Sequence, residues 1–199
     1  FGNLHYYNDS ITEFWMIEDE GYELADSKTL TKLKDGVQSI NFNFKDTNGE
    51  FVSLNDIQFK DKVVVVQILG TWCPNCLDET QFFLSYLEEH PNEGLEFVGL
   101  SVEAAKTEEK AMKRIKNMID KFNIPYPILL AQYGGTDKEK FLEKIPMLEN
   151  IISYPTTIII DKSGLVNSIH SGFNGPATGQ AYLDYKKDFY SEIEGLLKL

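Results

Sequence analysis

The feature that most constrains this chain is a Cys-x-x-Cys motif placed just after a continuous apolar run. The run is Val63–Leu69 (Val-Val-Val-Val-Gln-Ile-Leu), and the motif occupies residues 72–76 (Trp-Cys-Pro-Asn-Cys). A run of this length and composition predicts a central β-strand that is buried on both faces. Pro74 is typical of the first turn of a helix, where its missing N–H costs little. The chain is therefore expected to pass from a buried strand into a helix at the cysteine pair.

The two cysteines of the motif are the only cysteines among the 199 residues. Cys73 falls at the start of the predicted helix, where unpaired backbone N–H groups and the positive end of the helix dipole favour a thiolate. Cys76 lies in the same first turn, near enough to close a small disulfide ring. A pair placed in this way is a redox centre more often than a structural crosslink, and an inert buried pair is the alternative. Zinc is disfavoured because the three histidines, His5, His90 and His170, are far apart in the sequence.

Composition excludes several other classes of protein. Hydrophobic residues make up 42% of the chain and charged residues 25%, which is ordinary for a soluble globular domain and argues against disorder. The formal net charge is -12, from 19 basic and 31 acidic residues, and this disfavours nucleic-acid binding. No window approaches the roughly 20 apolar residues of a membrane span. The chain starts at Phe1 rather than at Met, so we expect a processed product whose missing part had room for a signal or a lipid anchor.

Periodicity and turn residues predict the order of the remaining elements. The aromatic residues within 1–36 suggest one or two strands, and residues 26–35 suggest a turn or connector. Beyond them, the expected strands are 40–44, 51–54, 63–69, 95–102, 126–131, 156–161 and 165–170. The expected helices are 74–90, 106–122, 138–148 and 179–197. A βα alternation of this kind implies an α/β fold around one sheet.

This order of elements resembles the thioredoxin fold, and in particular its TlpA/ResA-like branch. The resemblance covers residues 39–199 and is most specific in three stretches. The last two of these resemble TlpA-like proteins of Bacteroidetes-type bacteria in particular. They are residues 70–76 (Gly-Thr-Trp-Cys-Pro-Asn-Cys), 154–164 (Tyr-Pro-Thr-Thr-Ile-Ile-Ile-Asp-Lys-Ser-Gly) and 171–179 (Ser-Gly-Phe-Asn-Gly-Pro-Ala-Thr-Gly). The implied architecture is a three-layer α/β/α sandwich with a central mixed sheet, an N-terminal β-hairpin and an insertion before a cis-proline strand. Residues 37–199 would form this domain, and residues 1–36 an extension interpreted as the tail of an upstream β domain.

The resemblance also implies the roles of the two cysteines and of one acid. Cys73 corresponds to the exposed thiol that attacks a substrate disulfide, and Cys76 to the thiol that resolves the mixed disulfide. Glu79 corresponds to an acidic residue that lines a cavity beside the active site and handles protons, with a solvated first-turn glutamate as the alternative. Thioredoxin itself carries a buried acid six residues before its first cysteine, where this chain has Gln67, which does not titrate.

Four further residues are predicted to contact the substrate. Trp72 would form an apolar wall beside the cysteines, with core packing as the alternative, and Pro74 lies between the cysteines, where it would influence the redox potential. Pro155 matches the family's cis-proline, although only about 5–6% of X-Pro bonds are cis by base rate and a trans proline is the alternative. Tyr154, the residue before that proline, would offer its backbone to an extended substrate chain.

These residues lead to the prediction of an extracytoplasmic thiol–disulfide oxidoreductase, favoured as a reductase, without a cofactor or metal. Its partners would be protein thiols or disulfides, with a membrane thiol carrier as the electron donor. Its location would be the periplasm or cell envelope, with lipid anchoring through a missing N-terminus as one option. A peroxiredoxin-like peroxidase is less favoured because Thr71 is only two residues before Cys73 and Arg114 is the only arginine. A Sco-like copper carrier normally has Cys-x-x-x-Cys, one residue longer than here, and a non-enzymatic binding module remains the last alternative.

Overall fold

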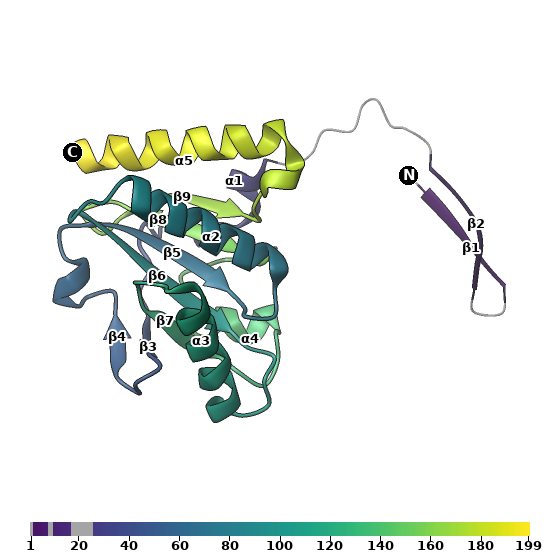
Figure 1. The fold of residues 1–199 in the computed structure, drawn as a ribbon, viewed down its shortest axis with the longest axis horizontal. Helices are drawn as coiled ribbons and strands as arrows, with labels where there is room; N and C mark the ends of the chain where they lie inside the picture. The colour runs from purple at the N-terminus through teal and green to yellow at the C-terminus, as the bar shows by residue number, and fades with distance from the viewer. Residues whose placement is uncertain (1, 8–9, 17–25) are drawn as a thin grey trace.

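The computed structural model describes residues 2–7, 10–16 and 26–199 (Figure 1). Strands β1 (Gly2–Tyr7) and β2 (Ser10–Met16) pair antiparallel in a two-stranded sheet. Phe1, which contributes to the aromatic pattern of the N-terminal segment, lies outside the described residues, as do residues 8–9 and 17–25.

All other strands belong to one seven-stranded mixed sheet with the order β4-β3-β7-β6-β5-β8-β9. The central strands β5, β6 and β7 are parallel to one another, and the outer pairings are antiparallel. The bounds are β3 (Asn43–Lys45), β4 (Phe51–Ser53), β5 (Val63–Leu69), β6 (Leu95–Val102), β7 (Ile128–Gln132), β8 (Thr156–Ile160) and β9 (Val166–Ser171).

Helices cover both faces of this sheet. They are α1 (Ser27–Leu30), α2 (Pro74–Glu89), α3 (Glu108–Phe122), α4 (Lys138–Leu142) and α5 (Gln180–Lys198), with short 3-10 turns at Ile57–Phe59 and Pro176–Thr178. Apolar residues of α2, α3 and α5 share one buried cluster, and α4 contributes to the cluster on the opposite face. The predicted three-layer α/β/α sandwich with a mixed sheet is confirmed.

Strand β5 divides the two clusters, because all seven of its residues are buried. Val63, Val65 and Leu69 face the cluster with α2, whereas Val64 and Val66 face the cluster with α4. This alternation follows from the two-residue period of a strand. Gln67 has the same parity as Val65, so its side chain points toward α2.

Two elements differ from the sequence-based expectation. The helix predicted at 138–148 ends at Leu142, because Pro146 lacks a backbone N–H and disfavours the helical conformation of the residue before it. The strand predicted from residue 40 starts only at Asn43. Ile40 and Phe42 are nevertheless buried, so their apolar character reflects core contacts outside the ladder.

Residues 26–36 make specific contacts with the main sheet and its loops. Thr31 is buried and shares a hydrogen bond of 2.7 Å with Ser171 of β9, and Leu33 forms a β-bridge with Leu148. Ser27 Oγ lies 3.1 Å from His170 Nδ1. The expected turn in this segment includes the short helix α1. The domain boundary at residues 36 and 37 stays a prediction.

Among the described residues, no helix is long and apolar enough to span a membrane.

Candidate active site

The cysteine pair lies where β5 ends and α2 begins. Cys73 is the residue that caps α2, and its sulfur accepts a hydrogen bond of 3.2 Å from the backbone N–H of Cys76. Pro74 occupies the first turn, as predicted. Cys73 and Cys76 form a disulfide with a Cα–Cα distance of 5.3 Å, inside the usual range for such bonds. A sulfur at this position sits at the positive end of the helix dipole, which favours a thiolate when the bond is reduced.

The two cysteines differ in their access to solvent. Cys73 is 8% exposed and Cys76 is 0% exposed. An incoming sulfur therefore reaches Cys73 first, and Cys76 is reachable only from inside the protein.

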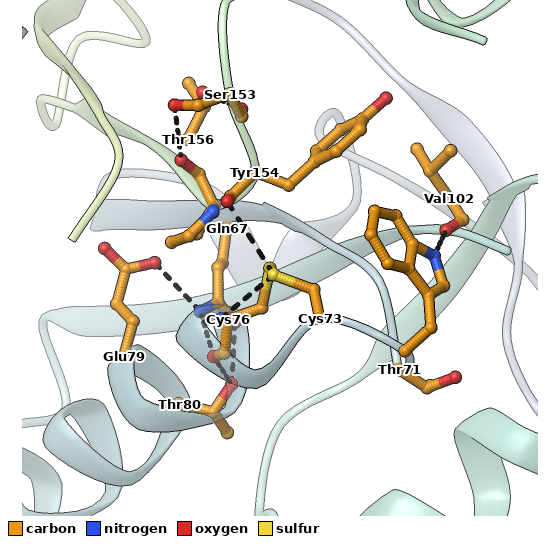
Figure 2. Close-up of a disulfide and its surroundings, with 12 residues drawn as sticks. Gln67, Thr71, Cys73, Cys76, Glu79, Thr80, Val102, Ser153, Tyr154 and Thr156 are labelled. Carbon is orange, nitrogen blue, oxygen red and sulfur yellow. Dashed lines mark hydrogen bonds between the residues drawn. A yellow bond between two sulfur atoms is a disulfide. The ribbon is translucent and has the colours of Figure 1, made fainter. Parts of the chain in front are cut away.

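The loop before β8 approaches Cys73 from the other side. The peptide bond between Tyr154 and Pro155 is cis, as the resemblance implied. The carbonyl oxygen of Tyr154 lies 3.7 Å from the sulfur of Cys73, so the sulfur lies between that carbonyl and the Cys76 N–H (Figure 2). The structure thus brings Tyr154 and the buried Pro155 into the same site as Cys73, from which Tyr154 is 81 residues away in the sequence.

Trp72 is partly exposed beside the pair. Its side chain is 42% exposed, its Nε1 donates a 2.8 Å hydrogen bond to the carbonyl of Val102, and its ring meets Tyr154 edge-to-face at a centroid distance of 5.9 Å. Trp72 is therefore a partly exposed side chain that is fixed in position, and it is not part of the core. Trp72, Tyr154 and Cys73 therefore lie next to one another. Their contact with a substrate stays a prediction.

Glu79 is completely buried and is held by three hydrogen-bond donors. Gln67 Nε2 donates to its Oε2 at 2.9 Å, and Thr157 Oγ1 and Tyr185 O–H donate to its Oε1 at 2.9 and 3.0 Å. Gln67 Nε2 also lies 3.2 Å from the carbonyl oxygen of Cys76 (Figure 2). The alternative of a solvated glutamate is therefore wrong for this fold.

Sequence reasoning missed Thr157 and Tyr185 as parts of the site. Thr157 stands opposite Gln67 in the antiparallel pairing of β5 with β8, so both side chains point to the α2 face. The sequence did contain a signal: Gln67 and Thr157 are polar residues in two strands predicted to be buried. Because buried polar groups need hydrogen-bond partners, the two residues could have been expected to share one. Tyr185 comes from α5, and no local pattern connects it to the cysteines.

Burial raises the pKa of Glu79 to about 7, from an ordinary value of 4.5, and the hydrogen bonds from Gln67, Thr157 and Tyr185 oppose that shift. A carboxyl with such a pKa exchanges its proton near neutral pH. The resemblance placed this acid beside a cavity. A cavity of about 40 Å³ between the sheet and α5 is lined by Thr157, His170 and Tyr185, but Glu79 itself does not line it.

A second buried acid, Glu103, holds the turn that leads to the cysteines. It accepts hydrogen bonds from the backbone N–H of Thr71 at 2.9 Å, from Thr71 Oγ1 at 2.8 Å and from Ser101 Oγ at 2.7 Å. Sequence analysis missed it, although it directly follows β6. The ends of the parallel strands β5 and β6 lie at the same edge of the sheet, so residues that follow them meet there.

Gly70 is predicted to be essential for the position of Trp72. A Cβ atom at Gly70 would come within 3.0 Å of the Trp72 indole and 2.9 Å of the Val102 carbonyl oxygen. Gly70→Ala is therefore expected to displace the indole, break its hydrogen bond and cost about 1–3 kcal/mol of unfolding free energy. Tryptophan fluorescence in a Trp15→Phe background checks the displacement, because Trp15 is the only other tryptophan.

Gly195→Ala is the matched control for this prediction. Gly195 lies inside helix α5 and a Cβ there meets no atom within 4 Å. Alanine has the higher helix propensity, so this variant is expected to gain up to about 1 kcal/mol with unchanged fluorescence. An unchanged Trp72 spectrum in Gly70→Ala would contradict the prediction.

Comparisons with known proteins identify the family of this chain. Residues 36–169 match the AhpC/TSA family. The chain is 30% identical to the thioredoxin-like protein YneN of Bacillus subtilis over 146 residues, which cover 73% of this chain and 76% of that protein. It is 25% identical to the thiol-disulfide oxidoreductase ResA of Bacillus subtilis over 140 residues, or 70% of this chain and 69% of ResA.

A solved structure is similar in fold. It is a thiol:disulfide interchange protein of the thioredoxin family from Chlorobium tepidum, with a TM-score of 0.58 and 21% identity. The match covers 81% of this chain and 96% of that protein. The family match over two thirds of the chain, together with the YneN relative, shows that this chain belongs to the AhpC/TSA family.

Proposed function

We propose that this protein is a thiol–disulfide oxidoreductase that reduces disulfides of protein substrates through Cys73 and Cys76. One observation carries the proposal: in a disulfide at a helix N-terminus, the first cysteine keeps some solvent-accessible surface and the second keeps none. Cys73 is 8% exposed and Cys76 is 0% exposed. Such an arrangement supports attack by Cys73 and resolution by Cys76.

The reaction begins with the reduced pair. The Cys73 thiolate attacks one sulfur of the substrate disulfide, so a Cys73–substrate bond forms and the substrate's second sulfur leaves and takes up a proton. Cys76 then loses its proton and attacks the Cys73 sulfur. The Cys73–Cys76 disulfide forms, the substrate's first sulfur leaves as a thiol, and two electrons have passed from the pair to the substrate.

Glu79 is the group that we assign to proton exchange with Cys76. Gln67 connects its carboxyl to the Cys76 backbone, and its pKa of about 7 lets it accept a proton at neutral pH. The thioredoxin-type acid is replaced by Gln67, so Gln67 takes the role of a connector rather than of a base.

We assign three residues to substrate contact and a fourth, Pro155, to holding one of them in place. Trp72 and Pro74 are exposed beside Cys73, and the Tyr154 carbonyl approaches its sulfur. Pro155 is buried, so its contribution is to hold the Tyr154 loop.

A peroxidase is the second candidate, and one contact disfavours it. The Thr71 hydroxyl, which would have to serve the nucleophile of a peroxiredoxin-like site, donates instead to the buried Glu103 at 2.8 Å. Because the Thr71 hydroxyl donates its proton to Glu103, it stabilises the turn and is not free to donate to a nucleophile.

We further propose an extracytoplasmic location, in the periplasm or cell envelope, and a membrane thiol carrier as electron donor. The support is the resemblance of residues 70–76, 154–164 and 171–179 to the TlpA/ResA-like branch. Fractionation of the native cells and trapping of the donor with a Cys76→Ser variant test these two points.

Insulin reduction tests the central proposal. The chemically reduced protein is expected to reduce insulin disulfides stoichiometrically, and catalytically with dithiothreitol. The reduction potential of the pair, measured in glutathione or dithiothreitol buffers, then decides the direction. A value near roughly -270 mV supports a reductase, and a value near roughly -120 mV supports a disulfide donor. A pair that never reduces would leave only a structural disulfide and overturn the proposal.

A further inference from the structure

A groove of about 490 Å³ opens beside Cys73, between the turn at residues 70–73 and helix α3. Its volume is in the range of sites that enclose a ligand of several residues or a small molecule. Trp72, Leu77 and Met118 give it an apolar lining, and Cys73 lines it as well. A chain that lies in this groove therefore passes next to the proposed nucleophile.

The charged residues of the groove are both cations. Arg114 and Lys121 line it, and no aspartate or glutamate does. Both residues are exposed, and neither takes part in a salt bridge within residues 26–199. The groove is therefore locally positive, although the whole chain has a formal net charge of -12. Arg114 is the only arginine of the chain.

Helix geometry explains why these cations meet at one place. Arg114, Met118 and Lys121 are spaced by four and three residues along α3, which puts them on one stripe of the helix. The stripe borders the buried face, where Met118 packs in the core cluster. The Lys121 ammonium also lies 5.1 Å from the centre of the Phe122 ring, a cation–π contact that keeps the charge at the groove.

We infer that this groove selects the substrate: it receives the polypeptide segment that carries the target disulfide, and that segment has acidic side chains close to its cystine. The inference rests on the proposed function and names its substrate class. Acidic groups would pair with Arg114 and Lys121, and neighbouring apolar side chains would pack on Trp72, Leu77 and Met118. Charge complementarity of this kind acts chiefly on the rate of productive encounter and on the choice of partner.

Three cyclic peptides with the same intramolecular disulfide test the inference. They differ only in two flanking residues, which are aspartate, asparagine or lysine. The fully reduced protein is mixed with each peptide in a single-turnover experiment at low ionic strength. Each rate constant is divided by the rate constant of dithiothreitol with the same peptide, which removes the intrinsic reactivity of the peptide disulfide.

The aspartate peptide is expected to react about fivefold faster than the asparagine peptide, and the lysine peptide more slowly than both, since each exposed ion pair contributes only modestly. About 0.5 M salt should remove the preference, because screening then acts over only a few ångströms. The ratio of rate constants is the readout, because it cancels any general effect of nearby cations on the Cys73 thiolate.

Arg114→Gln/Lys121→Gln is expected to bring the aspartate-to-asparagine ratio to about one. Lys116→Gln/Lys187→Gln is the matched control: it removes the same charge from two exposed lysines that do not line the groove, and should keep the ratio. Circular dichroism verifies that both variants fold, as surface substitutions usually permit. If the groove variant does not fold, the salt dependence of the aspartate-to-asparagine ratio in the wild-type protein still tests the inference.

Equal wild-type rates for the three peptides would overturn the inference while leaving the proposed function intact. Loss of the preference in the control variant would also overturn it, by assigning the effect to net charge. Failure to reduce any peptide, together with failure to reduce insulin, would overturn the proposed function and this inference with it.

Discussion

Cys73→Ser is expected to abolish insulin reduction, with a loss of at least about 10³-fold in rate. A serine hydroxyl at this position does not ionise near neutral pH, so the exposed end of the pair loses its nucleophile. Cys76 retains its thiol but is 0% exposed, so it does not replace the lost group. The measurement is the initial rate of insulin reduction with dithiothreitol as electron source, corrected for dithiothreitol alone.

Cys76→Ser is the informative partner variant. Cys73 still attacks the substrate, but no second thiol resolves the bond, so a mixed disulfide should accumulate and add the mass of the substrate in mass spectrometry. The unequal exposure of the two cysteines is the physical reason for this division of roles. A mixed disulfide that accumulates in Cys73→Ser instead of Cys76→Ser would reverse the assignment.

Glu79→Gln is expected to change the pH dependence of stability more than any other single substitution in this site. The folded-state pKa of Glu79 is about 7, against 4.5 for an ordinary glutamate, so between these values the folded protein binds more protons than the unfolded chain. The stabilisation is therefore complete below about pH 4.5 and is lost as the pH rises through 7. A rise of the pKa from 4.5 to about 7 corresponds to about 3 kcal/mol.

Denaturant unfolding of the oxidised protein at pH 4.5 and pH 8.5 measures this effect. The unfolding free energy of Glu79→Gln minus that of the wild type should rise by about 3 kcal/mol between the two pH values, because glutamine never ionises. The His170 pKa, which burial lowers to about 4, contributes equally to both proteins and cancels. A constant difference across this range would contradict the buried-acid assignment.

Two further variants separate burial from hydrogen bonding. Glu88→Gln is the same substitution on the exposed side of α2 and should leave the pH dependence unchanged. Tyr185→Phe removes one donor to the Glu79 carboxylate, so the Glu79 pKa should rise further and the loss of stability should move to higher pH. If Glu79 exchanges the proton of Cys76, the rate at which Cys76 resolves the mixed disulfide should change with pH near 7 in the wild type. This change should be absent in Glu79→Gln.

The sequence alone was sufficient for features that depend on neighbours along the chain. The apolar run Val63–Leu69 predicted a buried central strand, and Pro74 predicted the helix start that places Cys73 at a helix N-terminus. Local sterics and periodicity decide such features, so a short window contains the necessary information. Pro146 carried a local signal too, and it accounts for the end of α4 before residue 148.

The environment of the cysteines required the tertiary structure. Glu79 is buried because Thr157 and Tyr185, which are 78 and 106 residues away, close over it from β8 and α5. Arg114 reaches the groove beside Cys73 only because the fold places α3 across that groove from the turn at residues 70–73. Burial, and with it the pKa of Glu79, depends on all elements that surround a group in space, whereas periodicity describes one element at a time. The sequence by itself therefore determined the reactive pair and its helix, and only the packing of distant elements decided the acid that serves it and the charges beside it.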